Sequence, residues 1–373
     1  MTIGQNIKRL RRNADMTQEE LAEMLSISSQ AVSRWETDSA MPDISLLPAL
    51  VNIFGVTSDE LLGIDESNVE KKVEEIRKKA DNYSSRGYND EALKIIRDGL
   101  KIYPSSYALM RELMYLVMWE SDRDDKYSES ERNKLLDETI HLGEAILNKC
   151  TIDSLRHDAI QCLCTSYKKR EKKEKAIALA QTMPSLIVSQ ECLMPYVLDG
   201  TAAIRSHQEE IYGLLNLLVT SIHYSNYRTD EGIPFYTSDE HAQIREKAIK
   251  LIELMFENSD YEQFSLQLFP LYEDQADYYA KLHQTEETIN SLKNCCSFAI
   301  QFCKNEKSSD HTSLLFRGIG ANYTWIAGSQ NNFAAQLLEH MKKDEFDFLR
   351  ENVDFIKIES ELEQYAKKWS VGG

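Results

Sequence analysis

Helix-breaking residues are scarce along this chain, which contains only 14 Gly and 7 Pro among 373 residues. Few windows show the strict alternation of apolar and polar residues that a half-buried strand requires. Apolar residues instead recur at helical spacing, as Ile3, Ile7 and Leu10 do at the start of the chain. The sequence therefore predicts an all-α fold.

Charge and hydropathy limit the partners that this chain can have. Its 43 Lys and Arg against 61 Asp and Glu give a net charge of -18, so any contact with nucleic acid must be local. The longest apolar stretches fall short of the ~20 residues that span a bilayer, and the charged N-terminus does not resemble a signal peptide. We expect a cytoplasmic protein without a membrane partner.

Residues 1–65 contain five short helical segments with clear start signals. Thr17 with Glu20 forms a capping box for the second segment, and Ser28 can cap the third after a tight turn. We expect Ser45 to cap the fourth segment, which places Pro48 in its first turn.

The fifth segment has the same start signal as the second. Thr57 with Glu60 is expected to form another capping box, with Leu61 and Leu62 facing inward and Gly63 ending the helix. The module then closes near residue 65.

The third segment, residues 29–36, has two different faces. Ala31, Val32 and Trp35 fall on one side at ~100° per residue. The opposite side carries small or donor-rich residues, namely Ser29, Gln30, Ser33 and Arg34. Such a face suits a helix that enters the DNA major groove, where Gln pairs with adenine and Arg with guanine. The alternative is a capped bundle whose polar face is merely solvated.

The segments IGQNIKRLRR, MTQEELAEMLSISSQAVSRWE and MPDISLLPALVNIFGVTSDELL, in this order, resemble the Xre/Cro-type helix-turn-helix regulators. The resemblance implies that Gln18 binds a DNA phosphate and that Ser28 reaches the DNA backbone. It places Ser29, Gln30, Ser33 and Arg34 on base-facing positions. It further implies a partly buried salt bridge between Arg11 and Glu36.

One departure from the family concerns the loop after the third helix, which is Thr37, Asp38 and Ser39 instead of a basic or Gly-containing loop. Phosphate contacts are then limited to Lys8, Arg9, Arg12 and Arg34, so one module should bind weakly. We expect a homodimer on double-stranded DNA with two half-sites about 34 Å apart.

Beyond residue 65 the chain has a repeat character. Residues 66–80 form a charged linker or connecting helix, and residues 73–106 fit a tetratricopeptide pattern of ~34 residues, which starts a helical repeat domain over 73–373. Weaker matches centre on Ala159 with Tyr167 and on Tyr272 with Tyr279. We expect six to eight helix pairs in an α-solenoid, interrupted by longer loops at 120–130 and 228–240.

The function of these repeats is left open by the sequence. The combined architecture is similar to peptide-pheromone-responsive bacterial regulators, which implies a peptide in the groove, held by Asn residues such as Asn216, Asn226, Asn290 or Asn322. The repeats could instead dimerise or bind a protein, and in the alternative hypothesis the chain is an interaction scaffold with the N-terminal module as a tether. The sequence contains no enzyme, nucleotide or zinc motif, so we expect no catalysis, cofactor or metal.

Overall fold

A computed structural model describes residues 2–63, 66–225, 227–304, 310–320 and 327–369 of the chain. The chain divides into two compact units, Met1–Ile76 and Arg77–Gly373, called unit 1 and unit 2. Within the described residues the regular structure is helical, and strand-like pairing is limited to two isolated bridges, Arg228 with Pro234 and Asn331 with Lys368. The predicted all-α fold is confirmed. No described helix is long and apolar enough to cross a membrane.

Unit 1 is a small helical bundle around one apolar core. Its elements are α1 (Ile3–Asn13), α2 (Gln18–Met24), α3 (Ser29–Glu36), the 3-10 turn η1 (Ile44–Leu46), α4 (Leu47–Phe54) and α5 (Ser58–Leu62). Each α-helix contributes to the core, in which Ile7, Leu21, Val32, Leu50 and Leu61 are fully buried. The five predicted helices are therefore present.

The predicted caps of α2 and α3 are confirmed. The Thr17 hydroxyl accepts a hydrogen bond from the Glu20 amide at 3.2 Å, and the Glu20 carboxylate accepts one from the Thr17 amide at 2.6 Å. The Ser28 hydroxyl accepts a hydrogen bond from the Ala31 amide at 3.3 Å. These bonds satisfy donors at the helix ends that would otherwise lack partners.

The predicted cap of the fourth helix is wrong. Asp43, not Ser45, is the capping residue, and its carboxylate accepts hydrogen bonds from the Ser45 amide at 2.8 Å and the Ser45 hydroxyl at 2.7 Å. This cap begins η1, so α4 starts only at Leu47, with Pro48 still in its first turn. A carboxylate accepts both bonds at once, and the Ser45 hydroxyl is used as a donor.

The start of α5 differs from the sequence prediction in two details. Thr57 caps the helix, but the Glu60 carboxylate forms an ion pair with Arg9 at 3.4 Å instead of closing a capping box. Leu61 is fully buried, whereas Leu62 is 39% exposed. A helix of only five residues presents a single position to the core, and Leu61 occupies it.

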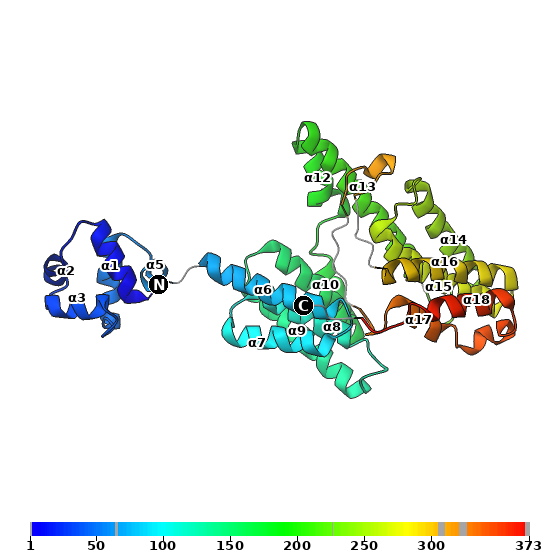
Figure 1. Cartoon of the computed structure of the whole chain (residues 1–373), viewed down its shortest axis with the longest axis horizontal. Helices are drawn as coiled ribbons and strands as arrows, with labels where there is room; N and C mark the ends of the chain where they lie inside the picture. The colour runs from blue at the N-terminus through cyan, green and yellow to red at the C-terminus, as the bar shows by residue number, and fades with distance from the viewer. Residues whose placement is uncertain (1, 64–65, 226, 305–309, 321–326, 370–373) are drawn as a thin grey trace. The chain divides into compact units, whose positions relative to one another are not determined.

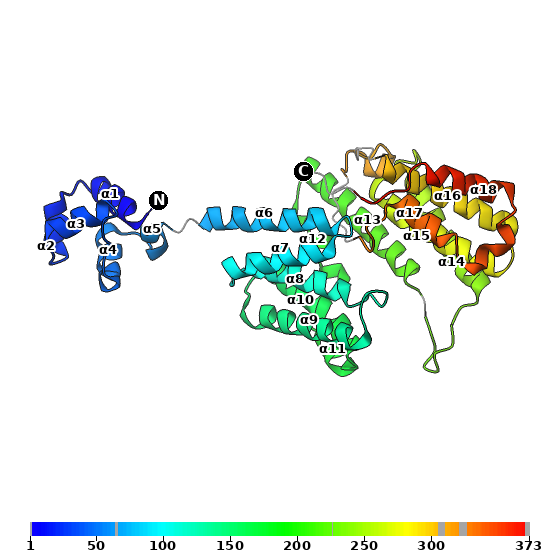
Figure 2. The same ribbon diagram turned by 60° about the horizontal axis from the view of Figure 1, so that its bottom comes forward.

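Unit 2 is built from consecutive helices, most of which pack against the next helix in the chain. α6 (Glu66–Ser84) crosses the boundary between the units, and unit 2 continues with α7 (Asn89–Ile102), α8 (Tyr107–Glu120), α9 (Glu129–Lys149), α10 (Asp153–Lys169), α11 (Lys173–Ala180), η2 (Leu186–Val188), α12 (Gln190–Val197), α13 (Gly200–His223), α14 (Ser238–Met255), η3 (Glu262–Phe264), α15 (Ser265–Lys281), α16 (Thr285–Cys303), η4 (Leu314–Phe316), α17 (Phe333–His340), η5 (Asp344–Leu349) and α18 (Val353–Glu363). Figure 2 shows α7 to α11 stacked beside one another. The helices α6 to α18 make six consecutive pairs and a final helix in the described part of the chain, at the lower end of the predicted six to eight pairs.

Residues 73–106, where the sequence predicts the first repeat, contain the end of α6 and all of α7. Ala80 of α6 and Ala92 and Ile96 of α7 are buried, and Gly87 lies in the turn between the helices with a positive φ of 75°. A Cβ at Gly87 would lie 2.3 Å from the backbone of Ser329, so the turn also requires Gly for close approach. The expected longer loops lie between α8 and α9 and between α13 and α14.

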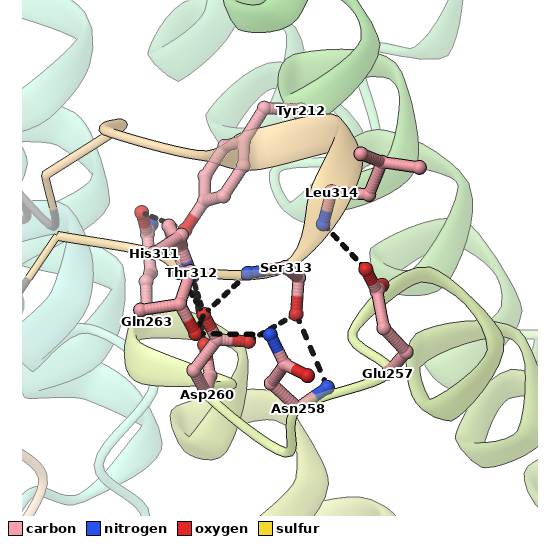
Figure 3. Close-up of polar contacts among 9 residues, drawn as sticks. All are labelled: Tyr212, Glu257, Asn258, Asp260, Gln263, His311, Thr312, Ser313 and Leu314. Atoms are coloured by element: carbon pink, nitrogen blue, oxygen red, sulfur yellow. Dashed lines mark hydrogen bonds and ion pairs between the residues drawn. The ribbon is translucent and has the colours of Figure 1, made fainter.

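A strap formed by residues 311–319 lies across α13 and the loop after α14, as Figure 3 shows. The Asp260 carboxylate accepts hydrogen bonds from the amides and hydroxyls of both Thr312 and Ser313. Burial raises the pKa of Asp260, but these hydrogen bonds outweigh it, so the pKa lies below its ordinary value. The buried His311 ring bridges the Asp260 carbonyl at 2.7 Å and the Tyr212 hydroxyl at 3.3 Å. The strap is therefore fixed to both elements.

Candidate nucleic-acid interface

The helix-turn-helix of unit 1 consists of α2, a four-residue connection and α3. Ser26 turns the chain with a left-handed φ of 55°, and the Ile27 amide donates to the Ala22 carbonyl at 2.9 Å. This bond satisfies a carbonyl at the end of α2 and reverses the chain within one turn. The apolar sides of both helices then pack into the core of unit 1, which leaves the opposite side of α3 at the surface.

The outer face of α3 matches the sequence prediction for exposure. Gln30 and Arg34 are exposed, and Ser29 and Ser33 are partly exposed. The side chains of Gln30 and Arg34 have no hydrogen-bond or ion-pair partner among the described residues, so all their donors remain available. Because Ser29 and Ser33 are short, the longer side chains of Gln30 and Arg34 can reach base edges in a groove.

Ser28 lies at the N-terminal end of this face. Its hydroxyl oxygen accepts the Ala31 amide, so its O–H hydrogen is still available as a donor. One side chain thus caps α3 and can also donate to a phosphate.

Three residues form a buried polar network behind this surface. Arg11 donates to both carboxylate oxygens of Glu36, from Nε at 2.5 Å and from a terminal nitrogen at 2.9 Å, and it also donates to the Met16 carbonyl at 2.6 Å. The Gln18 amide donates to the Glu36 carboxylate at 2.8 Å. The Glu36 side chain is 1% exposed and that of Arg11 is 10% exposed.

The charges in this network stabilise one another. Burial raises the pKa of Glu36, but the hydrogen bonds from Arg11 and Gln18 and the Arg11 charge outweigh it, so the pKa of Glu36 lies below its ordinary value. The hydrogen bond to Glu36 raises the pKa of Arg11. Both groups therefore stay ionised at neutral pH.

The structure thus brings Arg11 and Glu36 together and adds Gln18 to the pair, which sequence reasoning missed. A carboxylate has about four acceptor positions, and a bidentate Arg fills only two of them. A buried Glu therefore needs a further hydrogen-bond donor, and this requirement could have pointed to a residue such as Gln18. One N–H of the Gln18 amide faces Glu36, which leaves the second as a further donor.

The cationic residues around this surface are few. Arg9 is paired with Glu60 at 3.4 Å, whereas Arg12 is exposed on α1. In the loop after α3 the Thr37 hydroxyl donates to the Ser33 carbonyl at 2.9 Å and lies 3.1 Å from the Ser39 hydroxyl. These contacts order the loop without supplying positive charge.

The structure describes two of the four candidate Asn residues of unit 2. Asn216 accepts a hydrogen bond from Gln267, and Asn290 is exposed on α16. Asn226 and Asn322 lie outside the described residues. The seven Cys are free thiols, and no group of three or more potential metal ligands occurs among the residues that the structure describes.

Comparison with known proteins agrees with this geometry. A helix-turn-helix family model matches residues 7–61. The chain is 31% identical over 99 residues to the HTH-type transcriptional regulator ImmR of Bacillus subtilis (strain 168), covering 26% of this chain and 78% of ImmR. It is 28% identical over 120 residues to the immunity repressor protein of Bacillus phage phi105, covering 27% of this chain and 83% of the repressor.

Similarity to solved structures extends over more of the chain at lower identity. The crystal structure of Bacillus thuringiensis PlcR in complex with the peptide PapR7 and DNA aligns with a TM-score of 0.33 and 14% identity, covering 81% of this chain and 95% of PlcR. The apo form of the competence regulator ComR from Streptococcus vestibularis aligns with a TM-score of 0.28 and 17% identity, covering 80% and 91%. On the matched helix-turn-helix model and the match over most of ImmR, the chain belongs to the helix-turn-helix family of transcriptional regulators.

Proposed function

We propose that this regulator binds double-stranded DNA as a homodimer, with α3 of each copy in the major groove. The observation that carries this proposal is the exposed, unpartnered pair Gln30 and Arg34 on a capped helix whose other face is buried. The DNA-binding domain would comprise residues 1–65, the helical repeat domain residues 73–373, and the segment 66–80 would connect them. The protein would act in the cytoplasm.

Specificity and positioning fall to different residues in this proposal. Gln30 and Arg34 would contact base edges, with Ser29 and Ser33 short enough to allow a close approach. The remaining amide hydrogen of Gln18 and the hydroxyl hydrogen of Ser28 would donate to phosphates, which fixes the orientation of α3 but carries no sequence information.

A dimer follows from the shortage of phosphate contacts. Non-specific affinity comes chiefly from cations that neutralise phosphates, and Arg9 is already paired with Glu60. Two copies on two half-sites about 34 Å apart would double the contacts and read an operator with two-fold symmetry.

Unit 2 would be the regulatory part of the molecule. Stacked helix pairs present extended surfaces for peptides or proteins. A ligand of this class, such as the short peptide implied by the sequence resemblance, would act by shifting the population of dimers that can bind DNA. The alternative, a scaffold with the helix-turn-helix as a tether, finds no favouring observation in unit 1.

Selection from a random duplex pool with the full-length protein tests the proposal. We expect an enriched motif with two half-sites. The double variant Gln30→Ala/Arg34→Ala should bind that motif at least about 30-fold more weakly, since each bidentate base contact contributes ~1–3 kcal/mol. Arg317→Ala, which removes an exposed charge from unit 2, is the matched control and should bind normally. Unchanged specificity in the double variant would refute the assigned base contacts.

A further inference from the structure

Unit 2 exposes a group of large apolar side chains on η2, α12 and the start of α13. We call this group the hairpin face, and it comprises Leu186, Ile187, Val188, Leu193, Tyr196, Val197 and Ile204. Ile187 is 77% exposed and Tyr196 is 81% exposed. α12 packs against η2 and α13, so these side chains belong to one continuous element. Figure 1 shows α12 and the start of α13 standing out from the neighbouring helices of unit 2.

From this surface we infer that the hairpin face is covered by the same face of a second copy of the chain. The inference goes beyond the proposed function, because it assigns a surface of unit 2 and is measurable without DNA. Two arguments favour a second copy as the occupant, namely the size of the face and its charge.

The size of the face fits a dimer interface. With on the order of 100 Å² of accessible surface each, the seven side chains together approach the ~800 Å² per partner of a standard protein interface. The largest exposed apolar patch on a typical monomer is only about 300–600 Å². Contact of this face with its own copy is isologous, which closes at two subunits.

The charge of the face separates it from the rest of the molecule. The chain carries a net charge of -18, with 28% of its residues charged, so most surfaces of two copies repel each other. Residues 181–206 contain only Glu191, Asp199 and Arg205 as charged residues, for a net charge of -1. Two copies can therefore approach through this segment with little repulsion.

The α13 end of the hairpin face is also fixed to the rest of unit 2 before any partner arrives. On α13, Arg205 donates to the Gly318 carbonyl at 2.5 Å and Gln208 donates to the Leu315 carbonyl at 3.0 Å. Both acceptors lie on the 311–319 strap, which Asp260 and Tyr212 fix as seen in Figure 3. A rigid face loses less conformational entropy on association than a mobile one.

The test measures the mass of the full-length protein in solution without DNA. We expect twice the mass of the 43.0 kDa chain for the wild type, by sedimentation over a range of concentrations. Ile187→Glu/Tyr196→Glu places two like charges in each half of the contact and should weaken dimerisation at least tenfold. Val353→Glu, at a position 80% exposed on α18, is the matched control and should remain dimeric.

Hydrogen exchange supplies a measurement that needs no variant. Peptides covering residues 186–197 should gain protection as the wild-type concentration rises, and peptides of α18 should not. A monomeric wild type would overturn the inference and assign the face to another occupant. So would a dimer whose mass is unchanged by the double substitution and whose exchange at 186–197 is unchanged by protein concentration. Loss of DNA binding alone would count against the proposed function and leave the inference standing.

Discussion

Removing the Arg11 side chain should cost unit 1 a large part of its stability. In Arg11→Met, the Glu36 carboxylate, 1% exposed, loses both hydrogen bonds from Arg11 and keeps only the one from Gln18. Breaking a buried ion pair costs about 3–5 kcal/mol, because it leaves an uncompensated charge. At ~0.05–0.15 kcal/mol per residue, a unit of this size has a total stability of only about 4–11 kcal/mol.

Hydrogen exchange on the full-length protein can measure this loss, because peptides from residues 3–62 report unit 1 separately. A loss of 3 kcal/mol corresponds to protection lower by a factor of roughly 100 or more. Arg9→Met is the matched control on the same helix, since the pair of Arg9 with Glu60 is half-exposed and contributes at most about 1 kcal/mol. Similar exchange in both variants would refute the assignment of a buried network.

A double variant that removes both charges of the pair distinguishes an effect on the stability of unit 1 from an effect on DNA affinity. Arg11→Met/Glu36→Leu removes both charges, so its stability should return to within about 2 kcal/mol of the wild type. Gln18 then lacks the acceptor that orients its amide. We expect DNA affinity to fall while protection of unit 1 recovers, and a full recovery of affinity would show that Gln18 needs no anchor.

Three further results are expected. Gly4→Ala should destabilise unit 1 by about 1–3 kcal/mol in the same exchange measurement, because a Cβ there would lie 1.9 Å from the Trp35 carbonyl oxygen; unchanged protection would contradict this close packing. Folding lowers the pKa of Glu36, so the Glu36 carboxylate stabilises unit 1 at pH values above its ordinary pKa of 4.5, and this stabilisation is lost as the pH falls through the lower folded pKa. Glu36→Gln should therefore flatten the acid transition when unfolding is followed against pH. Gly87→Ala should reduce the protection of peptides around Ser329, and an unaltered exchange rate there would show that the turn tolerates a side chain.

Local signals in the sequence predicted unit 1 well. Thr17 and Ser28 act through amides three residues away, and such caps are determined by neighbours in the chain. The errors arose where tertiary contacts competed for a side chain. Glu60 pairs with Arg9 on another helix, and this choice depends on the packing of α1 against α5.

The site was predictable in its surface and less so in its interior. Helical periodicity alone placed Gln30 and Arg34 outward, because exposure on a short helix follows from which face is apolar. The bond from Gln18 to Glu36 joins two helices across the turn, and no spacing rule specifies it. In unit 2 the sequence did not predict the hairpin face. Apolar residues at helical spacing predict that a helix face is buried, but not whether the covering surface belongs to the same chain or to another.

The last described residues of the chain are tied back to the first helix pair of unit 2. The Ala327 amide donates to the Ser84 carbonyl at 2.9 Å, and the Tyr88 hydroxyl donates to the Trp369 carbonyl at 3.0 Å. In an open array of repeats, stability is a sum of terms between neighbours, so the ends fray independently of the middle. Contacts between the two ends make the stability of each end depend on that of the other. The first pair and the final residues should therefore melt in one cooperative step, and trimming either end should loosen the other.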